Sequence, residues 1–592
     1  MAVRKAIVLA AGLGTRLRPL TVSRPKPLLP VRGEPMLARI LDMLVSWGVE
    51  EIQVNAHYLA DQVAAFVADY QGGEPEAKGV EVSVSREEAI LGTGGVLRPL
   101  QDWIGDDPFW LVNGDIVVED LDPEPIEEAF ARSGNFAGCW MSEDFGPRTI
   151  EADPEGRVCN WKSDDAGYPG TYTYCGVALL SPEVLRFLPP LRRAEGGKGE
   201  GFCTIVEAYE NAMMSAAKFV VGVQEPEACW CDAGTVASFK ELNEGPMSPA
   251  LFGDARLDAL VSALGWEAED ALAEFLDARG SDRMFYRLYR GGSEQLPAGS
   301  ALGVIYEETR KENANARFPV LTRFLDGHGV RVPKLLADLP ESQAYATAFV
   351  EGQDLETRAN EKGADLVKLY LPALDVLKSL WAVPVASGVP ELEPAFGPEL
   401  YAWERELFER ECVKGRYGLD GLPSEAVSEL EKVAAVLCKE PQRLVHRDFQ
   451  SANLIYPKDG GKPYLIDYQG LRFGAAAYDV ASLLFDPYVP MDETDRKMLM
   501  ELAAKMPNAP SADVVTLAAV QRLCQALGAY CRLVSVGQPR FGKYILRALG
   551  NLHHALHEAG LPALAGFSHQ LIEREKIAAG GKAAFHPPRV SP

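Results

Sequence analysis

Apolar and polar positions along the first 115 residues follow two alternating patterns. Apolar residues spaced three and four apart predict amphipathic helices over residues 35–47 and 60–70. Short apolar or β-branched runs predict strands in four places, at residues 5–11, 51–58, 80–85 and 109–113. Strands that alternate with helices indicate an α/β domain with a mostly parallel sheet and helices on both faces. Ligands of such sheets bind beyond the carboxyl ends of the strands, where Gly12 and Asp115 fall.

The pattern changes after about residue 243, where Gly, Pro and Ser with little periodicity indicate a linker. We expect helix over residues 254–279, followed by strands at 282–290, 300–306 and 343–350. From about residue 361 most segments have helical spacing, notably 364–381, 401–412, 424–438, 496–505 and 513–535. We therefore expect an α/β domain over 1–245, a linker over 246–253, and an α+β domain over 254–592 with a small lobe to about 352 and a helical lobe from about 353.

Composition and charge limit the class of protein. Of the 592 residues, 47% are apolar and 24% charged, which is typical of globular proteins, and the net charge of −25 argues against a nucleic-acid or membrane partner. The ten cysteines lack the spacing of a zinc site, so we expect reduced thiols in a cytoplasmic protein. The short apolar stretch near the N-terminus is unlike a signal peptide, and no apolar run approaches the roughly 20 residues of a membrane helix.

The segment LAAGLGTR, residues 9–16, indicates phosphate binding. Gly12 and Gly14 allow backbone N–H groups to approach a ligand without a Cβ atom in the way, and consecutive N–H groups in a turn bind anions. Arg16, Arg18 and Lys26 follow as cations. The glycine pattern alone is weak evidence, since it is neither a Walker loop nor a dinucleotide fingerprint.

A longer set of strings resembles the sugar-1-phosphate nucleotidyltransferases. These strings are AAGLGTRLRPLTVSRPKPLLPVRGEPML, ILGTGGVL at 90–97, VNGD at 112–115 and WCDAGT at 230–235, and the resemblance covers about residues 4–243. It implies a Rossmann-like nucleotidyltransferase fold in which Asp115 and Asp232 hold Mg²⁺ and Arg16 and Lys26 act on the phosphates. The implied nucleotide-binding residues are Leu9, Ala11, Gly12, Gly14, Thr15, Arg16, Lys26, Gly92 and Thr93, and the implied sugar-binding residues are Asn113, Lys162 and Gly176.

The chemistry implied by this family agrees with those residue types. A sugar phosphate attacks the α-phosphorus of a nucleoside triphosphate and pyrophosphate leaves, so a metal and cations supply most of the catalysis. Within the family, RPKPLLPVRGEPML and NAHYL are most similar to N-acetylmuramate 1-phosphate uridylyltransferases, and phosphocholine cytidylyltransferases are also similar. The Glu-Lys-Pro of many hexose members is missing; NWKSDDAGYPG, with Lys162, stands in its place.

A second motif, HRDFQSANLIYPKDGGKPYLIDYQG at 446–470, has the spacing of a kinase catalytic loop. Asp448 is placed to accept the proton of a substrate hydroxyl. Asn453 and Asp467 are placed to hold Mg²⁺ on ATP. Three polar residues recur by chance, but the Asn and the second Asp at these intervals make chance a poor explanation.

The motif and the following AAYDVASLL resemble the aminoglycoside phosphotransferase and choline kinase superfamily, whose kinase-like domain is bilobal. The resemblance is closest to anomeric kinases of N-acetylmuramate and N-acetylglucosamine, and it implies that Asp479 braces the catalytic loop. It also places Ser281 in the hairpin over the phosphates and Val350 in the hinge at adenine. The phosphate-binding lysine has no clear counterpart in GVIYEETRK, where Lys311 comes late. The aromatic stretch 396–408 packs helices or lines the sugar pocket.

Together the resemblances imply two consecutive reactions with Mg²⁺, ATP and UTP. N-acetylmuramate, or N-acetylglucosamine, would be phosphorylated at its anomeric hydroxyl, and the sugar phosphate would react with UTP to give the UDP-sugar and pyrophosphate. Small molecules are the expected partners. A choline kinase fused to a phosphocholine cytidylyltransferase is the nearest alternative. A binding or regulatory protein with inactive nucleotide folds is an alternative from another class, against which the intact acidic residues argue; an antibiotic-modifying phosphotransferase would have no use for the fused transferase.

Overall fold

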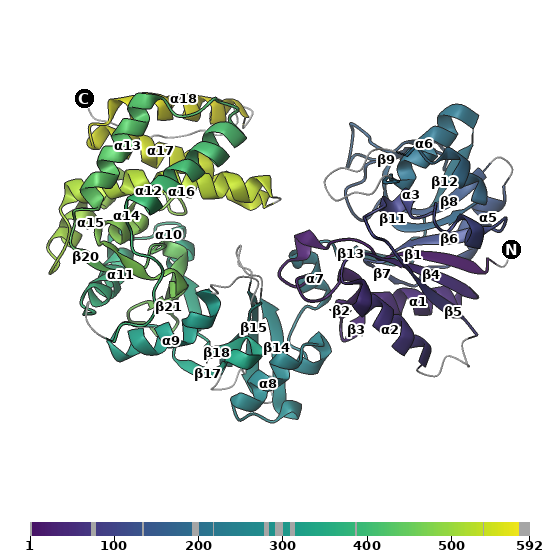
Figure 1. The fold of residues 1–592 in the computed structure, drawn as a ribbon, viewed down its shortest axis with the longest axis horizontal. Helices are drawn as coiled ribbons and strands as arrows, with labels where there is room; N and C mark the ends of the chain where they lie inside the picture. Colours follow the sequence, from purple (N-terminus) through teal and green to yellow (C-terminus); the bar gives the residue numbers. More distant parts are fainter. Residues whose placement is uncertain are drawn as a thin grey trace. The chain divides into compact units, whose positions relative to one another are not determined.

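The computed structural model describes residues 3–72, 79–132, 135–191, 201–216, 218–276, 283–290, 300–307, 314–384, 388–536 and 538–578. The chain divides into two compact units (Figure 1), one made of residues 1–298 with 303–307 and the other of residues 299–302 with 308–592. The predicted linker, residues 246–253, lies inside the first unit, and the domain boundary proposed from the sequence stays a prediction. All ten cysteines are free, as the composition suggested.

A nine-stranded sheet forms the centre of the first unit. Its path is β10-β9-β11-β6-β1-β4-β5, with β8 beside β11 and β12 beside β8. The central strands β1 (Lys5–Leu9), β4 (Glu51–Ala56), β5 (Glu81–Arg86) and β6 (Phe109–Asn113) are parallel, as predicted. The outer strands are β8 (Asn135–Ser142), β9 (Ile150–Ala152), β10 (Val158–Asn160), β11 (Thr171–Leu180) and β12 (Phe219–Val223), and β11 runs antiparallel to β6 and β8.

Both faces of this sheet are buried, which explains the continuous apolar runs of its strands. Successive side chains of a strand point to opposite faces, and Ile7 and Val8 accordingly belong to two different hydrophobic clusters. Helices α1 (Met36–Ser46) and α2 (Ala60–Gly72) cover one face, and α6 (Ile205–Ala216) packs on the other. The remaining helices of this region are α3 (Gly92–Gly95), α4 (Gln101–Ile104), α5 (Glu124–Ala131) and α7 (Val236–Leu242).

The segment 254–279 corrects one prediction. Helix α8 (Ala255–Ala263) is shorter than the predicted helix, and the strand β14 follows at Ala271–Leu276. Alternate residues of β14 are buried, beginning with Ala271, so the true period is two, although Ala, Leu and Glu favour helix by propensity. Tertiary pairing with β15 (Met284–Arg290) decides the outcome.

The strands predicted after residue 282 are present. A small sheet has the order β14-β15-β16-β18-β17, with β16 at Ser300–Ile305, β17 at Leu335–Leu339 and β18 at Ala344–Ala348. Helix α9 (Ala314–Gly327) precedes β17. Two smaller sheets follow. One has the order β19-β21-β22, with β19 at Gly352–Asp354, β21 at Leu454–Pro457 and β22 at Tyr464–Leu465. The other pairs β20 (Gln442–Val445) with β23 (Arg472–Ala475).

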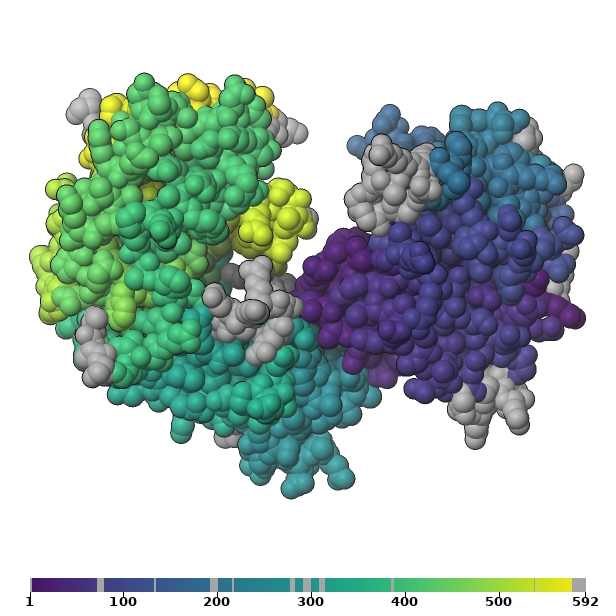
Figure 2. All heavy atoms as spheres, in the orientation of Figure 1, coloured from purple at the N-terminus to yellow at the C-terminus, as the bar shows by residue number. Residues whose placement is uncertain are grey.

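Helices make up most of the second unit. They are α10 (Leu355–Ala359), α11 (Leu366–Trp381), α12 (Pro398–Leu407), α13 (Ser424–Leu437), α14 (Ala477–Leu484), α15 (Glu493–Ala504), α16 (Ala512–Ser535), α17 (Gly542–Glu558) and α18 (Pro562–Ala578). Among the described residues, α16 alone is long and apolar enough to cross a membrane, but 83% of that window is buried inside the structure. Its neighbours α12, α13, α14 and α17 pack around it, so α16 is the core helix of this unit. Figure 2 shows each half of the chain as a closely packed body.

Candidate active sites

The glycine-rich loop follows β1 and is held by buried polar groups. The carbonyl of Leu9 accepts a hydrogen bond from the N–H of Gly114 at 2.9 Å, which joins the ends of β1 and β6. The N–H of Ala10 donates to Oδ1 of Asn55 at 2.7 Å, and Nδ2 of Asn55 donates to Oε1 of Glu87 at 2.6 Å. Burial raises the pKa of Glu87, and the hydrogen bond from Asn55 opposes that rise. The loop therefore leaves the sheet in a fixed direction, with Ala11 buried and Gly12 exposed.

The turn at Gly14 is left-handed and tightly packed. Its φ is +60°, and a Cβ atom there would lie 2.8 Å from the Thr21 side chain, so glycine is required. Oγ1 of Thr21 donates to the Gly14 carbonyl at 2.7 Å, while the hydroxyl of Tyr58 donates to the carbonyls of Thr21 and Val22. The turn thus holds the exposed Thr15 and Arg16 at the end of β1.

The structure brings together four of the charged residues predicted for the first site. Nζ of Lys26 lies 2.5 Å from Oδ2 of Asp115 and 3.7 Å from Oδ1 of Asp232. A Cβ atom on Gly234 would lie 2.6 Å from the carboxylate of Asp232 and 3.0 Å from Nη2 of Arg16, so that guanidinium is also close. Lys26 is 7% exposed, and the positive charge of its ammonium group lies beside both negatively charged carboxylates.

Backbone pairing explains why the two carboxylates meet. Asp115 immediately precedes β7 (Ile116–Glu119), and Asp232 ends β13 (Cys229–Asp232), which runs antiparallel to β7 with Asp232 opposite Ile116. The Ala233 N–H donates to the Asp115 carbonyl at 3.2 Å. Two residues 117 positions apart thereby share one end of a two-stranded ribbon.

These carboxylates fit a magnesium ion. They already converge on a cation, the Lys26 ammonium group, and carboxylate oxygens are the ligands that Mg²⁺ prefers. Within the residues that the structure describes, no group of three or more His, Cys, Asp or Glu side chains could hold a metal. This agrees with Mg²⁺, which commonly takes one or two carboxylates and completes its shell with waters and substrate phosphates.

Gly92 and Thr93 are the first residues of α3 and lie beside α6. Gly92 has φ +78°, and a Cβ atom there would lie 2.5 Å from the carbonyl oxygen of Cys203. Oγ1 of Thr93 accepts a hydrogen bond from the N–H of Ile205 at 2.9 Å and so satisfies a free donor at the first turn of α6. The hydroxyl of Thr93 is therefore engaged with the protein, and the predicted contact of these residues with the base remains a prediction.

Two of the three predicted sugar-binding residues are adjacent. A Cβ atom on Gly176, which has φ +83°, would lie 2.8 Å from Nδ2 of Asn113, so the amide of Asn113 lies directly over Gly176. Asn113 is also the direct partner of Leu9 in the sheet. Lys162 lies in an exposed bend after β10, where its backbone N–H bonds to Oδ1 of Asn160 at 2.9 Å. That bond connects Lys162 to its own bend and leaves its sugar contact a prediction.

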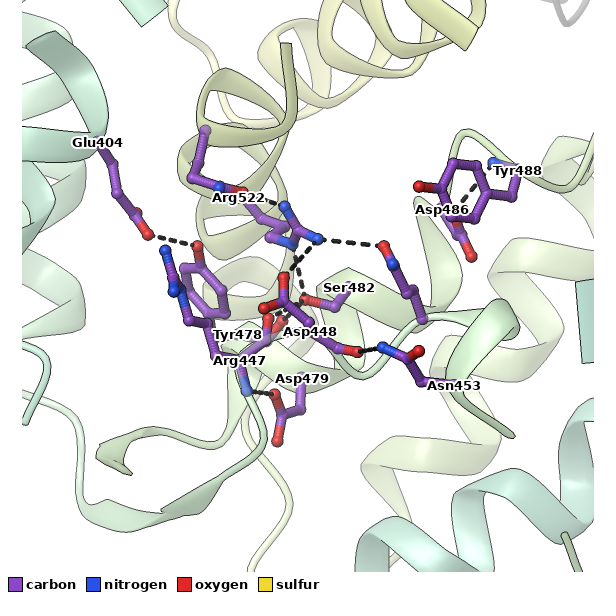
Figure 3. A network of polar contacts seen from close by, with 12 residues as sticks. Glu404, Arg447, Asp448, Asn453, Tyr478, Asp479, Ser482, Asp486, Tyr488 and Arg522 are labelled. Carbon is purple, nitrogen blue, oxygen red and sulfur yellow. Dashed lines mark hydrogen bonds and ion pairs between the residues drawn. The ribbon is translucent and has the colours of Figure 1, made fainter. Parts of the chain in front are cut away.

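In the second unit, Asp479 holds the catalytic loop. Its two carboxylate oxygens accept the N–H group of His446 at 2.7 Å and that of Arg447 at 2.9 Å, the second of which is drawn in Figure 3. Burial raises the pKa of Asp479 to about 7, although both N–H bonds act to lower it. Burial likewise lowers the pKa of His446, whose Nε2 contacts the carbonyl of Ile466 at 2.9 Å. The bracing role predicted for Asp479 therefore has a geometric basis.

The two predicted magnesium ligands of this unit lie beside the ends of two paired strands: Asn453 directly precedes β21, and Asp467 follows β22. Nδ2 of Asn453 donates to the Asp448 carbonyl at 2.8 Å, which leaves its Oδ1 as the atom suited to a metal. The N–H of Ile466 donates to the Asn453 carbonyl at 3.1 Å and places Asp467 beside it. Asp467 and Arg447 both have positive φ, 63° and 79°, a strained conformation that is common at active sites. The oxygen donors of Asn453 and Asp467 fit Mg²⁺.

A buried polar network that no sequence motif indicated lies behind Asp448. Nη2 of Arg522, on α16, lies 3.0 Å from Oδ1 of Asp448. Glu404, on α12, is fully buried and accepts hydrogen bonds from the Tyr478 hydroxyl at 2.9 Å and from Nε2 of Gln521 at 3.0 Å. Burial raises the pKa of Glu404, and the positive charge of Arg447 opposes that rise. Helical spacing identified these residues only as positions in amphipathic helices, because a charged residue in a core looks like one at the surface until its neighbours are known.

Aromatic side chains gather near the catalytic loop at a place that the sequence did not indicate. Asp486 accepts hydrogen bonds from the Ser451 hydroxyl and from the Tyr488 N–H, the second of which is drawn in Figure 3. The Tyr488 ring lies 6.0 Å from that of Tyr530 and 4.5 Å from that of Tyr544, centroid to centroid. By contrast, the stretch 396–408 packs helices: Phe396 and Tyr401 are buried and stack on each other, and the Phe396 ring also contacts the ring of Tyr478 at a tilt.

The hinge residue Val350 lies between β18 and β19. It lines a cavity of about 600 Å³ whose other walls include Arg331, Lys334, Glu351 and Tyr464. The N–H of Phe349 donates to the Ser300 carbonyl at 3.1 Å, which ties the hinge to β16. Ser281 and Lys311 lie outside the described residues, so the structure does not test the hairpin contact or locate the lysine.

Comparison with known proteins agrees with this division of the chain. The nucleotidyl transferase family matches residues 5–247, and the phosphotransferase enzyme family matches residues 277–515. N-acetylmuramate alpha-1-phosphate uridylyltransferase of Caulobacter vibrioides is 35% identical over 201 residues, which cover 30% of this chain and 76% of that protein.

More distant relatives share the first region. Mannose-1-phosphate guanylyltransferase 1 of Arabidopsis thaliana is 30% identical over 188 residues, covering 31% of this chain and 51% of that protein. The chain spans about half the length of the first curated relatives it matches. A structure of UDP-glucose pyrophosphorylase complexed with UDP-glucose matches 41% of this chain and 97% of that one, at 17% identity and a TM-score of 0.34. The chain therefore belongs to the nucleotidyl transferase family through residues 5–247, and its residues 277–515 match the phosphotransferase enzyme family.

Proposed function

We propose that this enzyme phosphorylates N-acetylmuramate at its anomeric hydroxyl with ATP and then transfers a uridylyl group from UTP to the product. The proposal rests chiefly on the 35% identity to an N-acetylmuramate alpha-1-phosphate uridylyltransferase, in a chain that also contains a phosphotransferase domain. A sugar 1-phosphate is what a sugar 1-kinase makes and what a uridylyltransferase uses. Their fusion keeps the intermediate at high local concentration near the second site. The two reactions together would salvage a cell-wall sugar. We place them in the cytoplasm, where ATP and UTP are available, with small molecules as partners.

In the phosphorylation step, Asp448 accepts the proton of the anomeric hydroxyl through a carboxylate that is about one-third exposed. The sugar oxygen then attacks the γ-phosphorus of ATP, and the bond to the bridging oxygen of ADP breaks. Asn453 and Asp467 would hold Mg²⁺, which neutralises phosphate charge when bound. Asp479 keeps Asp448 in reach by fixing the backbone of the two preceding residues.

In the uridylyl step, an oxygen of the sugar phosphate attacks the α-phosphorus of UTP and pyrophosphate leaves. Lys26 and Arg16 lie beside the carboxylate of Asp232 and supply positive charge to the phosphates. Asp115 and Asp232 would hold Mg²⁺. Lys26 is held in place by these carboxylates before UTP binds, so little reorganisation is needed at the moment of reaction.

A second function is favoured by one observation, the tyrosine group beside the catalytic loop. Tyr488, Tyr530 and Tyr544, together with Asp486 and Glu356, offer aromatic faces and carboxylates, which are the groups that bind a quaternary ammonium ion. The same rings could stack on the apolar face of a sugar. We therefore retain a choline kinase fused to a phosphocholine cytidylyltransferase as the alternative.

Product analysis by mass spectrometry distinguishes the two functions. The purified protein is incubated with Mg²⁺, ATP, UTP and CTP and, in separate reactions, with N-acetylmuramate, N-acetylglucosamine, other hexoses and choline. We expect UDP-N-acetylmuramate from free N-acetylmuramate. UDP-N-acetylglucosamine as the dominant product would change the sugar, and CDP-choline would overturn the sugar assignment while keeping both reaction types.

A further inference from the structure

One buried cation contacts the proposed catalytic base. Nη2 of Arg522 lies 3.0 Å from Oδ1 of Asp448, and the two side chains point toward one another in Figure 3. The side chain of Arg522 is 9% exposed, whereas that of Asp448 is 36% exposed. The carboxylate therefore faces the site on one side and a buried guanidinium on the other.

The guanidinium of Arg522 is itself fixed by several partners. Its Nε donates to Oγ of Ser482 at 3.2 Å, its Nη1 donates to Oε1 of Gln525, and its Nη2 also donates to Oε1 of Gln450 at 3.3 Å. These partners come from α14, from the next turn of α16 and from the catalytic loop. A planar group with partners along each edge cannot rotate without losing several hydrogen bonds at once.

Ser482 connects this arrangement to the backbone of the loop. Its hydroxyl contacts the carbonyl of Arg447 at 3.1 Å and that of Tyr478 at 2.9 Å, and it accepts the Nε–H of Arg522. Helix α14 also carries Asp479, which holds the N–H groups of the same loop. The loop backbone is thus held by α14, and the Asp448 side chain is held by α16.

We propose that Arg522 is the positioning residue for the catalytic base: it fixes Asp448 through Oδ1 and directs Oδ2 to the acceptor hydroxyl. This inference rests on the proposed function, in which Asp448 takes the proton. The positive charge attracts the carboxylate, and the planar fork fixes its orientation. Arg522 acts through Asp448 and takes no part in the reacting bonds.

Two substitutions separate the effect of charge from the effect of shape. Arg522→Lys keeps the charge and loses the fork, so we expect kcat for sugar phosphorylation to fall about 10²-fold, as for a catalytic group displaced by about 1 Å, with KM for ATP unchanged. Arg522→Met also removes the charge. We expect a larger loss of kcat, again with KM for ATP unchanged, because neither charge nor shape then holds the Asp448 side chain.

Arg416→Lys is the matched control. Arg416 makes a two-fold contact with the buried carboxylate of Glu575, at 2.8 and 2.7 Å, outside the proposed site. We expect this variant to lower the melting temperature and leave kcat for sugar phosphorylation unchanged. If Arg522→Lys and Arg522→Met keep kcat within about three-fold of wild type, or lose kcat only in proportion to their melting temperatures, Arg522 is merely structural.

The structure of the full-length Arg522→Met variant with a non-hydrolysable ATP analogue supplies a readout that does not depend on the sugar. We expect the Asp448 carboxylate to leave its wild-type position. An unmoved Asp448 would overturn the positioning role, even if the wild-type enzyme phosphorylated none of the tested sugars. Failure of the wild type on every acceptor, with a displaced Asp448 in the variant, would count against the proposed substrate and still support the role of Arg522.

Discussion

At the scale of single residues, each site sets a carboxylate against a buried cation. Lys26 lies between Asp115 and Asp232 in the first site, and Arg522 contacts Asp448 in the second. The choice of cation suits each task. An ammonium group is a compact point charge suited to phosphates, whereas a guanidinium is a rigid fork that can orient a carboxylate.

Lys26→Met tests the residue that faces both acidic side chains of the first site. The change leaves Asp115 and Asp232 without their counter-charge and takes a cation away from the phosphates. We expect kcat for uridylyl transfer to a supplied sugar 1-phosphate to fall about 10²- to 10³-fold, with sugar phosphorylation unchanged. Lys218→Met is the control, since Lys218 pairs with the partly exposed Glu183, which is not a predicted site residue. A loss below ten-fold would show that Lys26 has no direct part in catalysis.

The residues proposed to carry chemistry stand within long sequence motifs, whereas the residues that contact and orient them do not. Asp448 and Asp115 follow apolar runs within long, specific strings, so position and residue type agreed. Arg522 and Glu404 lie within helices whose spacing shows only amphipathic character. Their function depends on side chains more than 70 positions away, which a pattern along the chain does not reveal.

At the scale of elements, short antiparallel pairs bring distant acidic residues together. Strands β7 and β13 join Asp115 to Asp232, and the pairing of β21 with β22 places Asn453 near Asp467. Helix α14 is buried along its whole length and carries Asp479 into the protein interior. That burial has an energetic consequence that pH can reveal.

The raised pKa of Asp479 predicts a pH dependence of stability. The folded value is about 7, against about 3.9 for an unfolded aspartate, so between these values the folded state holds a proton that the unfolded state has lost. The stabilisation from this group is therefore complete below about pH 4 and is lost as the pH rises through 7. Three pKa units correspond to at most about 4 kcal/mol.

Asp479→Asn removes this titration. Denaturant unfolding of the second unit at pH 5 and pH 8 should show that the free energy of unfolding of wild type, minus that of the variant, decreases as the pH rises. A difference that stays constant or grows with pH would mean that Asp479 is ionised at both values, despite its burial.

The order of elements was predictable over most of the chain, and the failure at 254–279 has a clear cause. Long helices such as α16 and buried strands such as β6 have strong, simple periods. The strand Ala271–Leu276 is only six residues long and is composed of good helix formers, and it becomes a strand because β15 pairs with it. The antiparallel direction of β11 was equally out of reach, since direction depends on long-range connections and not on local pattern.

At the scale of the whole molecule, each compact unit contains one set of the predicted catalytic residues. The residues predicted for uridylyl transfer lie in the first unit, and Asp448, Asn453 and Asp467 lie in the second. A ligand that binds only the folded state of one unit stabilises that unit. In differential scanning calorimetry we expect UTP with Mg²⁺ to raise one transition and ATP with Mg²⁺ to raise another, by several degrees at about 100 times Kd, where the stabilisation is about 2.7 kcal/mol. Both nucleotides shifting one and the same transition would argue against separate sites.

The most direct test of two sites acting in sequence is complementation between two inactive variants. Asp448→Asn should lose sugar phosphorylation and keep uridylyl transfer to a supplied sugar 1-phosphate, and Asp115→Ala should do the reverse. With N-acetylmuramate, ATP and UTP, we expect neither variant alone to form the UDP-sugar and their mixture to form it, as followed by mass spectrometry. Formation of the UDP-sugar from free sugar by either variant alone, or loss of both half-reactions in one folded variant, would contradict the assignment of the two steps to two separate sites.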